Sequence, residues 1–159
     1  MFKKILVCLD GSNLAEQILP FIMAQGNCFD KIVFLKVLAS PEISLPFGVP
    51  GAPSVPINTE ARLARFQKEL IEAPAYLEKI AQPLREIGLD VDCVVLQGMP
   101  SETIVNYAKD NRVELIAMAT HGHSGLRQVI VGSTAEFVLK NAGWTLLLMT
   151  PQKQGKAAR

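Results

Sequence analysis

The stretch "THGHSGLRQVIVGST", residues 120–134, places three glycines and several hydroxyl and histidine side chains around a short apolar run. The residues before it, 113–119, are mostly apolar and lack turn-forming residues, which predicts a buried strand. The residues after it, 134–141, have helical spacing, with Gly143 as the expected C-terminal cap. The stretch is therefore predicted to connect a strand to a helix, which is where open α/β sheets bind anionic ligands.

Similar strand-like segments occur along the whole chain and alternate with helical patterns. Their continuous apolar runs suit strands covered on both faces, as in a parallel sheet. The alternation predicts one doubly wound α/β domain over residues 1–151, with helices on both faces and a flexible tail at 152–159. The five expected strands are Lys4–Leu9, Lys31–Leu38, Asp92–Leu96, Val113–Ala119 and Thr145–Met149.

Residues 40–58 carry five prolines, which exclude a helix or a central strand there. Two interpretations remain open for this proline-rich loop: a flap or partner-binding loop, and a disordered insertion. The helix expected after it contains Pro74 and Pro83, so we expect a kinked or interrupted helix that keeps one face on the sheet. Its apolar residues repeat every seven positions, at Leu63, Leu70, Leu77 and Leu84.

Whole-chain properties limit the function classes. The chain has 159 residues, 49% hydrophobic residues and a formal net charge of +1, so nothing suggests an electrostatic nucleic-acid or membrane binder. No apolar run reaches the roughly 20 residues of a membrane span. The three widely spaced cysteines suit a reducing compartment. We therefore expect a soluble, cytoplasmic protein.

The glycine-rich stretch has the chemistry of a phosphate site. Gly122 and Gly125 permit positive φ and let backbone N–H groups approach a ligand closely. Gly132, Ser133 and Thr134 open a helix whose first N–H groups lack intrahelical partners and carry partial positive charge. Phosphate oxygens would satisfy those donors. The alternative is that Ser133 or Thr134 only caps the helix.

The other end of the site is expected at the end of the first strand, at Asp10, Gly11 and Ser12. A carboxylate would repel a polyphosphate, so Asp10 better suits ribose hydroxyls or a base. The alternative role of Asp10 is to cap the first helix. Both interpretations stay open and do not exclude each other.

Other candidate groups carry less weight. His121 and His123 lack a third ligand nearby in sequence, so a solvated loop is favoured over a metal site. Arg127 could reach a phosphate or make a surface contact. No lysine precedes Ser133, as it would in a Walker loop. Without a placed nucleophile or base, the chain is expected to be a binder and at most a weak ATPase.

Over residues 1–151 the sequence resembles the universal stress protein family. "KKILVCLDGS", residues 3–12, is similar to the family's first strand and Asp-x-Ser turn, and "LQGMPSETIVNYAKD", residues 96–110, to its Gly-x-Pro passage. The family motif G-x-x-G, nine residues, then G-[ST] matches Gly122 and Gly132-Ser133. Ala119 stands where the motif has its first glycine, which leaves less room for backbone approach.

The resemblance implies a five-stranded sheet in the order 3-2-1-4-5, with strand 145–149 forming a homodimer interface. It also implies a bound adenine nucleotide, ATP, AMP or ADP, with any Mg²⁺ or Mn²⁺ held through its phosphates. Carried over by position, Val37 meets the base, although a core valine is the alternative. The nucleotide-binding set is completed by Asp10, Gly11, Ser12, Ala119, His121, Gly122, Gly125, Gly132, Ser133 and Thr134.

Three functions follow from these observations. The first is a nucleotide-binding, dimeric stress-response or signalling protein with an unknown partner. The second is a dimeric interaction module of the same fold that does not bind nucleotide. The third is a slow ATPase.

Overall fold

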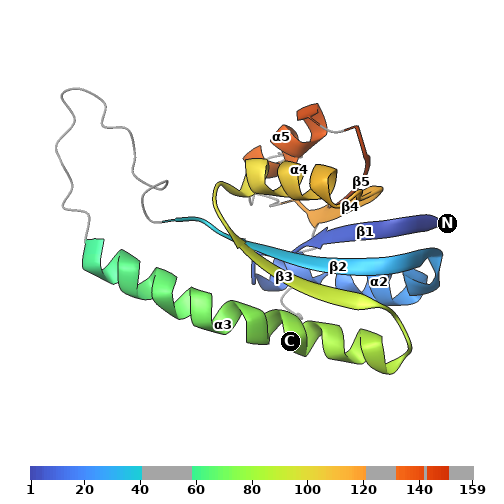
Figure 1. Ribbon diagram of the computed structural model, residues 1–159, viewed down its shortest axis with the longest axis horizontal. Coiled ribbons are helices and arrows are strands. Elements are labelled where there is room, and N and C mark those ends of the chain that lie inside the picture. Colours follow the sequence, from blue (N-terminus) through green and yellow to red (C-terminus); the bar gives the residue numbers. More distant parts are fainter. Residues whose placement is uncertain (41–58, 121–131, 142, 151–159) are drawn as a thin grey trace, which may run out of the picture.

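The computed structural model describes residues 1–40, 59–120, 132–141 and 143–150. Strands and helices alternate along these ranges, as the sequence predicts (Figure 1). In chain order the elements are β1 (Phe2–Cys8), α1 (Asn13–Glu16), α2 (Leu19–Gln25), the 3-10 turn η1 (Gly26–Cys28), β2 (Phe29–Leu38), α3 (Thr59–Glu86), β3 (Val91–Gln97), α4 (Pro100–Asp110), β4 (Leu115–Ala119), α5 (Ser133–Asn141) and β5 (Thr145–Met149).

The strands form one parallel sheet in the order β3-β2-β1-β4-β5. This confirms the predicted fold class and strand order. Strands β2 and β3 extend the sheet on one side of β1, and β4 and β5 extend it on the other (Figure 1). The direction of winding therefore reverses between β1 and β4. Doubly wound folds bind ligands at this point, beyond the carboxyl ends of the strands.

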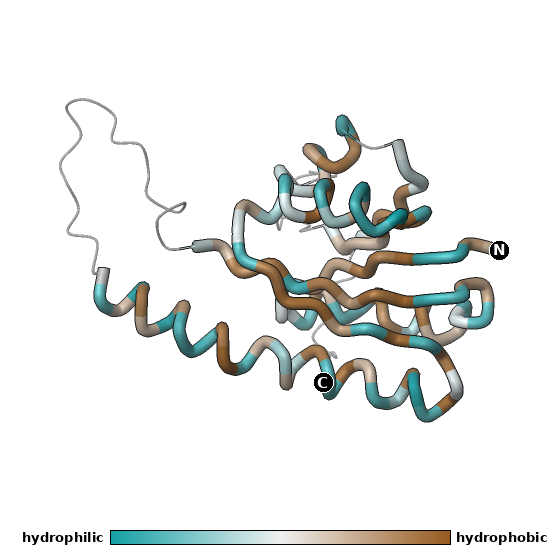
Figure 2. The backbone as a smooth tube through the Cα atoms, viewed as in Figure 1, coloured by the Kyte–Doolittle hydropathy of each residue, from teal (hydrophilic) through white to brown (hydrophobic). Residues whose placement is uncertain are grey.

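Helices cover both faces of the sheet. Side chains alternate between these faces along each strand, so one strand contributes to two core clusters. Ile5 and Val7 of β1 pack with residues of α1, α2 and α3 in one core cluster, whereas Leu6 packs with residues of α4 and α5 in the other. Figure 1 shows α2 and α3 on one side and α4 and α5 on the other. The continuous brown segments of the central strands in Figure 2 reflect this burial on both faces.

Helix α3 runs without interruption from Thr59 to Glu86, through both Pro74 and Pro83. The expected interruption is therefore wrong. Both prolines lie on the exposed side, while Leu77 and Leu84 are fully buried against the sheet. Burial of this apolar stripe offsets the local cost of the prolines, which is about 3 kcal/mol for each interior position.

The heptad stripe of α3 is buried only in its C-terminal half. Leu77 is 0% exposed, whereas Leu63 is 45% exposed. Figure 2 shows brown bands along the entire helix, including the part that extends beyond the sheet. The expectation that one face packs on the sheet therefore holds for the second half of the helix.

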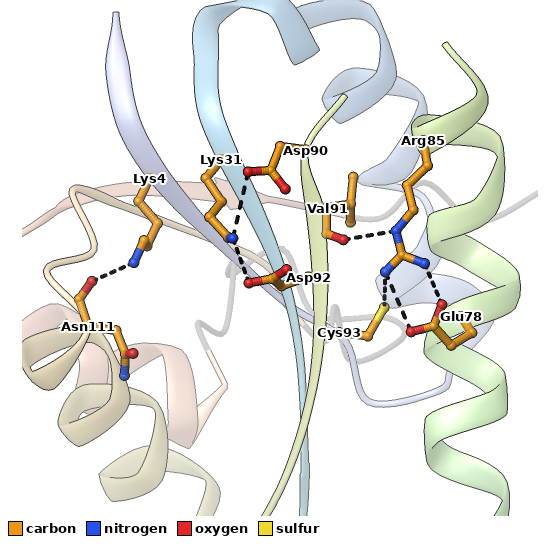
Figure 3. Close-up of polar contacts among 9 residues, drawn as sticks. All are labelled: Lys4, Lys31, Glu78, Arg85, Asp90, Val91, Asp92, Cys93 and Asn111. Atoms are coloured by element: carbon orange, nitrogen blue, oxygen red, sulfur yellow. Dashed lines mark hydrogen bonds and ion pairs between the residues drawn. The ribbon is translucent and has the colours of Figure 1, made fainter. Parts of the chain in front are cut away.

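Polar contacts join β2 to β3 and α3 to β3 at the end opposite the carboxyl ends of the strands (Figure 3). Lys31 on β2 lies 2.8 Å from the Asp92 carboxylate on β3 and 3.6 Å from that of Asp90. Arg85 on α3 donates to the main-chain oxygen of Val91 and pairs with Glu78. These contacts fix the neighbouring elements beside each other, and partly exposed pairs of this kind contribute only modestly to stability.

Several predictions fall outside the described residues. These are residues 41–58 of the proline-rich loop, residues 121–131 of the glycine-rich stretch, and the tail. The cap expected at Gly143 stays a prediction, because residue 142, which joins it to α5, also lies outside the described residues. None of the helices in the described ranges has the length and apolar character needed to cross a bilayer.

Candidate functional site

A cavity of about 530 Å³ opens at the carboxyl edge of the sheet. It lies at the strand reversal, where β1, β2 and β4 end and where α4 and α5 begin. Six residues predicted from the sequence line it, together with others that were not predicted. The lining residues are Cys8, Leu9, Asp10, Ala15, Leu35, Val37, Pro100, Ile104, Met118, Ala119, Gly132, Ser133, Thr134 and Ala135.

The turn after β1 brings a carboxylate to this cavity. Asp10 is exposed, and its Oδ1 accepts a hydrogen bond from the Ser12 amide at 2.8 Å. Ser12 is the N-cap of α1, and its hydroxyl oxygen accepts from the Ala15 amide at 3.1 Å. The alternative role of Asp10 as the helix cap is therefore wrong, because Ser12 occupies that position.

The start of α5 forms another wall of the cavity. The Glu136 amide donates to the Gly132 carbonyl at 2.9 Å, which makes Gly132 the residue that precedes the first helical position. Ser133 and Thr134 are the first two helical residues, so neither is the N-cap. Amides in the first turn of a helix lack intrahelical partners, and the helix dipole adds partial positive charge at this end. This wall suits an anion.

Gly132 has open space around it among the described residues. A Cβ built there would meet no described atom within 4 Å. Since Gly132 lines the cavity, the missing side chain leaves space at the start of α5. This is the arrangement expected where a ligand approaches the backbone closely.

The remaining walls are mainly apolar. Val37 comes from β2 and Met118 from β4, and both side chains belong to or pack against the core cluster beneath α4 and α5. Pro100 and Ile104 of α4 line the cavity but were not predicted as site residues. Residues 98–100, the Gly-x-Pro sequence before Ile104, were recognised in the sequence analysis. They were the sequence feature that could have indicated that α4 begins beside the site.

The charges around the cavity are unevenly placed. Among the described lining residues, Asp10 is the only charged side chain, and no Lys, Arg or His is present. An anionic group would therefore be bound chiefly by the amides and dipole of α5. Burial raises the pKa of the Cys8 thiol to about 12, so this thiol is neutral at physiological pH and is a poor nucleophile.

Three predicted residues of the glycine-rich stretch have no described position. His121, Gly122 and Gly125 lie outside the described residues. Ala119, the last residue of β4, does line the cavity. Gly11 and Ser12 belong to the turn that carries Asp10, although the cavity lining does not include them.

The sequence and the fold match those of known proteins. The sequence model of the universal stress protein family matches residues 1–149. Universal stress protein MJ0577 of Methanocaldococcus jannaschii is 31% identical over 156 residues, which cover 94% of this chain and 95% of that protein. Universal stress protein MJ0531 of the same organism is 29% identical, with 97% and 85% covered.

Solved structures extend the comparison. The structure of MJ0577 superposes with a TM-score of 0.73 and 28% identity, and covers 97% of this chain and 99% of that one. An Arabidopsis thaliana universal stress protein family member with AMP bound has a TM-score of 0.65 at 18% identity, covering 98% and 96% of the two chains. A universal stress protein in complex with cAMP has a TM-score of 0.61 at 15% identity, covering 95% and 98%. On the family match and the relative at 31% identity, the chain belongs to the universal stress protein family.

Proposed function

We propose that the cavity binds an adenine nucleotide, and that the protein acts in the cytoplasm as a nucleotide-binding stress-response or signalling protein. One observation carries this proposal. A carboxylate at Asp10, an apolar wall at Val37 and the amino end of α5 at Gly132 meet around a single cavity. A nucleotide needs these three environments together, for its ribose, its base and its phosphates.

Each part of the nucleotide has a matching wall. The first-turn amides of α5 and the hydroxyls of Ser133 and Thr134 receive the phosphates. Asp10 accepts hydrogen bonds from ribose hydroxyls at a distance from those phosphates, and Val37 packs on the base. The AMP and cAMP complexes of the two structural neighbours support an adenine nucleotide as the ligand class. Any Mg²⁺ or Mn²⁺ would be held through the phosphates.

The chemistry of the described cavity residues favours binding over turnover. Efficient phosphoryl transfer needs a positioned nucleophile and groups that stabilise the developing charge. Cys8 is held as a neutral thiol, and Asp10 lies at the end of the cavity assigned to the ribose. Slow hydrolysis and a module without nucleotide remain outcomes of the experiments below.

The first experiment measures the ligand directly. Protein purified without added ligand is denatured and its supernatant analysed for ATP, ADP and AMP, and calorimetric titration then gives the affinity for each. We expect saturable binding with one site per chain. Phosphate release under single-turnover conditions identifies slow hydrolysis. Absence of both co-purified and titrated nucleotide would contradict the proposal and favour the interaction module.

The second experiment tests the location of the site with Gly132→Val. A Cβ at Gly132 meets no described protein atom within 4 Å, and Gly132 lines the cavity. We therefore expect an intact fold and a loss of nucleotide binding of at least about tenfold. Gly143→Val is the matched control, because Gly143 has equally open surroundings away from the cavity. Unchanged affinity in Gly132→Val, with normal circular dichroism, would exclude this wall as the phosphate site.

A further inference from the structure

Lys36 makes a contact that connects three elements beside the cavity. It precedes Val37 on β2, and because strand side chains alternate, the two residues point to opposite faces of the sheet. The Lys36 Nζ donates a hydrogen bond to the main-chain oxygen of Asp10 at 2.7 Å. The same ammonium group lies 5.3 Å from the centre of the Tyr76 ring on α3. Both distances are typical of favourable interactions, a charge-assisted hydrogen bond and a cation–π contact.

The turn that Lys36 contacts has a backbone conformation that favours glycine. Gly11 has a φ of +90°, which residues with a side chain rarely adopt. A Cβ at Gly11 would lie 2.6 Å from the Lys36 Nζ, so the ammonium group is seated directly against the turn. Glycine is therefore favoured by the backbone conformation, and a side chain at this position would displace the Lys36 ammonium group.

The turn also controls the carboxylate that lines the cavity. Asp10 contributes its main-chain oxygen to Lys36 and its Oδ1 to the Ser12 amide. Ser12 in turn caps α1. The direction of the Asp10 carboxylate thus depends on a main-chain segment that is held at one end by α1 and at the other by Lys36.

We propose that Lys36 is a positioning residue of the nucleotide site, which holds the turn at Asp10 in the conformation that accepts the ribose. This inference rests on the proposed function. Without the ammonium group, a turn containing glycine would sample further conformations before binding, and their loss would oppose binding. Lys36 acts through Asp10 and touches no part of the ligand.

Tyr76 completes the contact from the side of α3. Burial, together with the neighbouring carboxylates of Glu16 and Asp10, raises the pKa of the Tyr76 hydroxyl above its ordinary value, so the ring stays neutral. A neutral ring under the ammonium group keeps Lys36 directed at the Asp10 carbonyl. The contact makes α3 part of the support for the site.

A second role for Lys36 would give a different result. Its positive charge could attract phosphates through space, in which case its removal would weaken ATP more than AMP, and adenosine least. Salt would also screen that attraction. Positioning of Asp10 instead affects the ribose end, so adenosine, AMP and ATP should lose affinity by the same factor.

The experiment titrates adenosine, AMP and ATP into wild type, Lys36→Met, Lys36→Arg and Tyr76→Leu. We expect Lys36→Met to weaken all three ligands by about tenfold, with a smaller loss in Tyr76→Leu. Lys36→Arg should restore most of the affinity, because a guanidinium can donate to the same carbonyl. In an Asp10→Ala background, Lys36→Met should cause no further loss. Wild-type affinity in Lys36→Met, or a loss that grows with the number of phosphates, would overturn the proposal.

A measurement without nucleotide separates this proposal from the proposed function. Hydrogen exchange of peptides covering residues 10–16 reports on the Ser12 and Ala15 amides, which the turn protects. We expect faster exchange there in Lys36→Met than in wild type, and near wild-type exchange in Lys36→Arg. Failure of the wild type to bind any nucleotide would refute the proposed function. Equal exchange in Lys36→Met and wild type would refute the holding of the turn, whatever the ligand.

Discussion

At the scale of single residues, the three cysteines differ in environment, and this difference predicts their reactivity. Cys28 is exposed, Cys93 lies on β3 beside Arg85 and Glu78, and Cys8 lines the cavity. Burial raises the pKa of the Cys8 thiol to about 12 and is also the main cause that raises the pKa of Cys93 to about 11. Only the thiolate reacts with alkylating reagents, so Cys8 and Cys93, the two half-buried thiols with a raised pKa, should react slowly.

We therefore expect iodoacetamide at pH 8 to label Cys28 first, Cys93 more slowly and Cys8 last. At that pH only about one Cys8 thiol in ten thousand is ionised, and its labelling rate should rise about tenfold for each pH unit up to pH 11. Peptide mass spectrometry over a time course measures the three rates. Labelling in denaturant is the control, because all three thiols then react alike. Rapid labelling of Cys8 at pH 8 in the native protein would contradict the raised pKa of this thiol.

Residue Gly132 illustrates what the sequence could not decide. The sequence left open whether Ser133 or Thr134 caps the helix, because each is a good N-cap residue. The first helical hydrogen bond, from Glu136 to Gly132, assigns the cap position to the glycine. Asp10 and Ser12 differ in the same way, since a two-residue shift in the start of α1 decides which of them is the cap. Helix boundaries depend on local geometry that composition does not resolve.

At the scale of elements, the strands were well predicted, with boundaries within two residues of those observed. Strands such as β1 are buried on both faces, and their continuous apolar runs are unusual enough to identify them. The course of α3 was less predictable, because the local effect of Pro74 and Pro83 competes with burial of Leu77 and Leu84 against the sheet. Tertiary packing of these leucines outweighs the local effect of the prolines, so the helix continues.

The prolines of α3 give an element-scale prediction. Pro83 lies inside the helix on its exposed side, where it removes a donor and crowds the preceding turn. Pro83→Ala should therefore raise the free energy of unfolding by between about 1 and 3 kcal/mol. Urea denaturation measures the change. Pro20→Ala is the control, since Pro20 lies in the first turn of α2, where its missing N–H costs little. A fall in stability in Pro83→Ala would show that α3 does not continue through this position in solution.

At the scale of the whole molecule, the cavity depends on how the elements are wound and not on any one motif. The residues that line it come from the ends of β1, β2 and β4 and the starts of α1, α4 and α5. Sequence motifs predicted the contributions of Asp10 and Gly132, whereas Leu35 and Ile104 become neighbours only through the strand order. These apolar positions look like ordinary core residues in sequence, which is why they were missed.

The open edge of the sheet predicts self-association. Among the described residues, β5 has a strand neighbour on one side only, β4, and the side chains at Leu146–Met149 are half-buried. The amide of Thr145 and the carbonyl of Met149 point toward β4, since they bond Glu114 and Thr120. Main-chain groups alternate in direction along a strand, so those of residues 146 and 148 point to the open edge. An apolar edge of this kind is favourably covered by a partner.

We expect a homodimer in which the β5 edges of two chains pair, and Leu148→Pro tests it. Proline removes the outward N–H of residue 148 without breaking a bond to β4. Leu148→Ala is the control, because it also removes the leucine side chain beyond Cβ but keeps that N–H. Light scattering at micromolar concentration should therefore give a dimer for wild type and Leu148→Ala, and a monomer for Leu148→Pro. Circular dichroism confirms that both variants are folded. A wild-type monomer at this concentration would refute the dimer, and a dimeric Leu148→Pro would place the interface away from the main chain of β5.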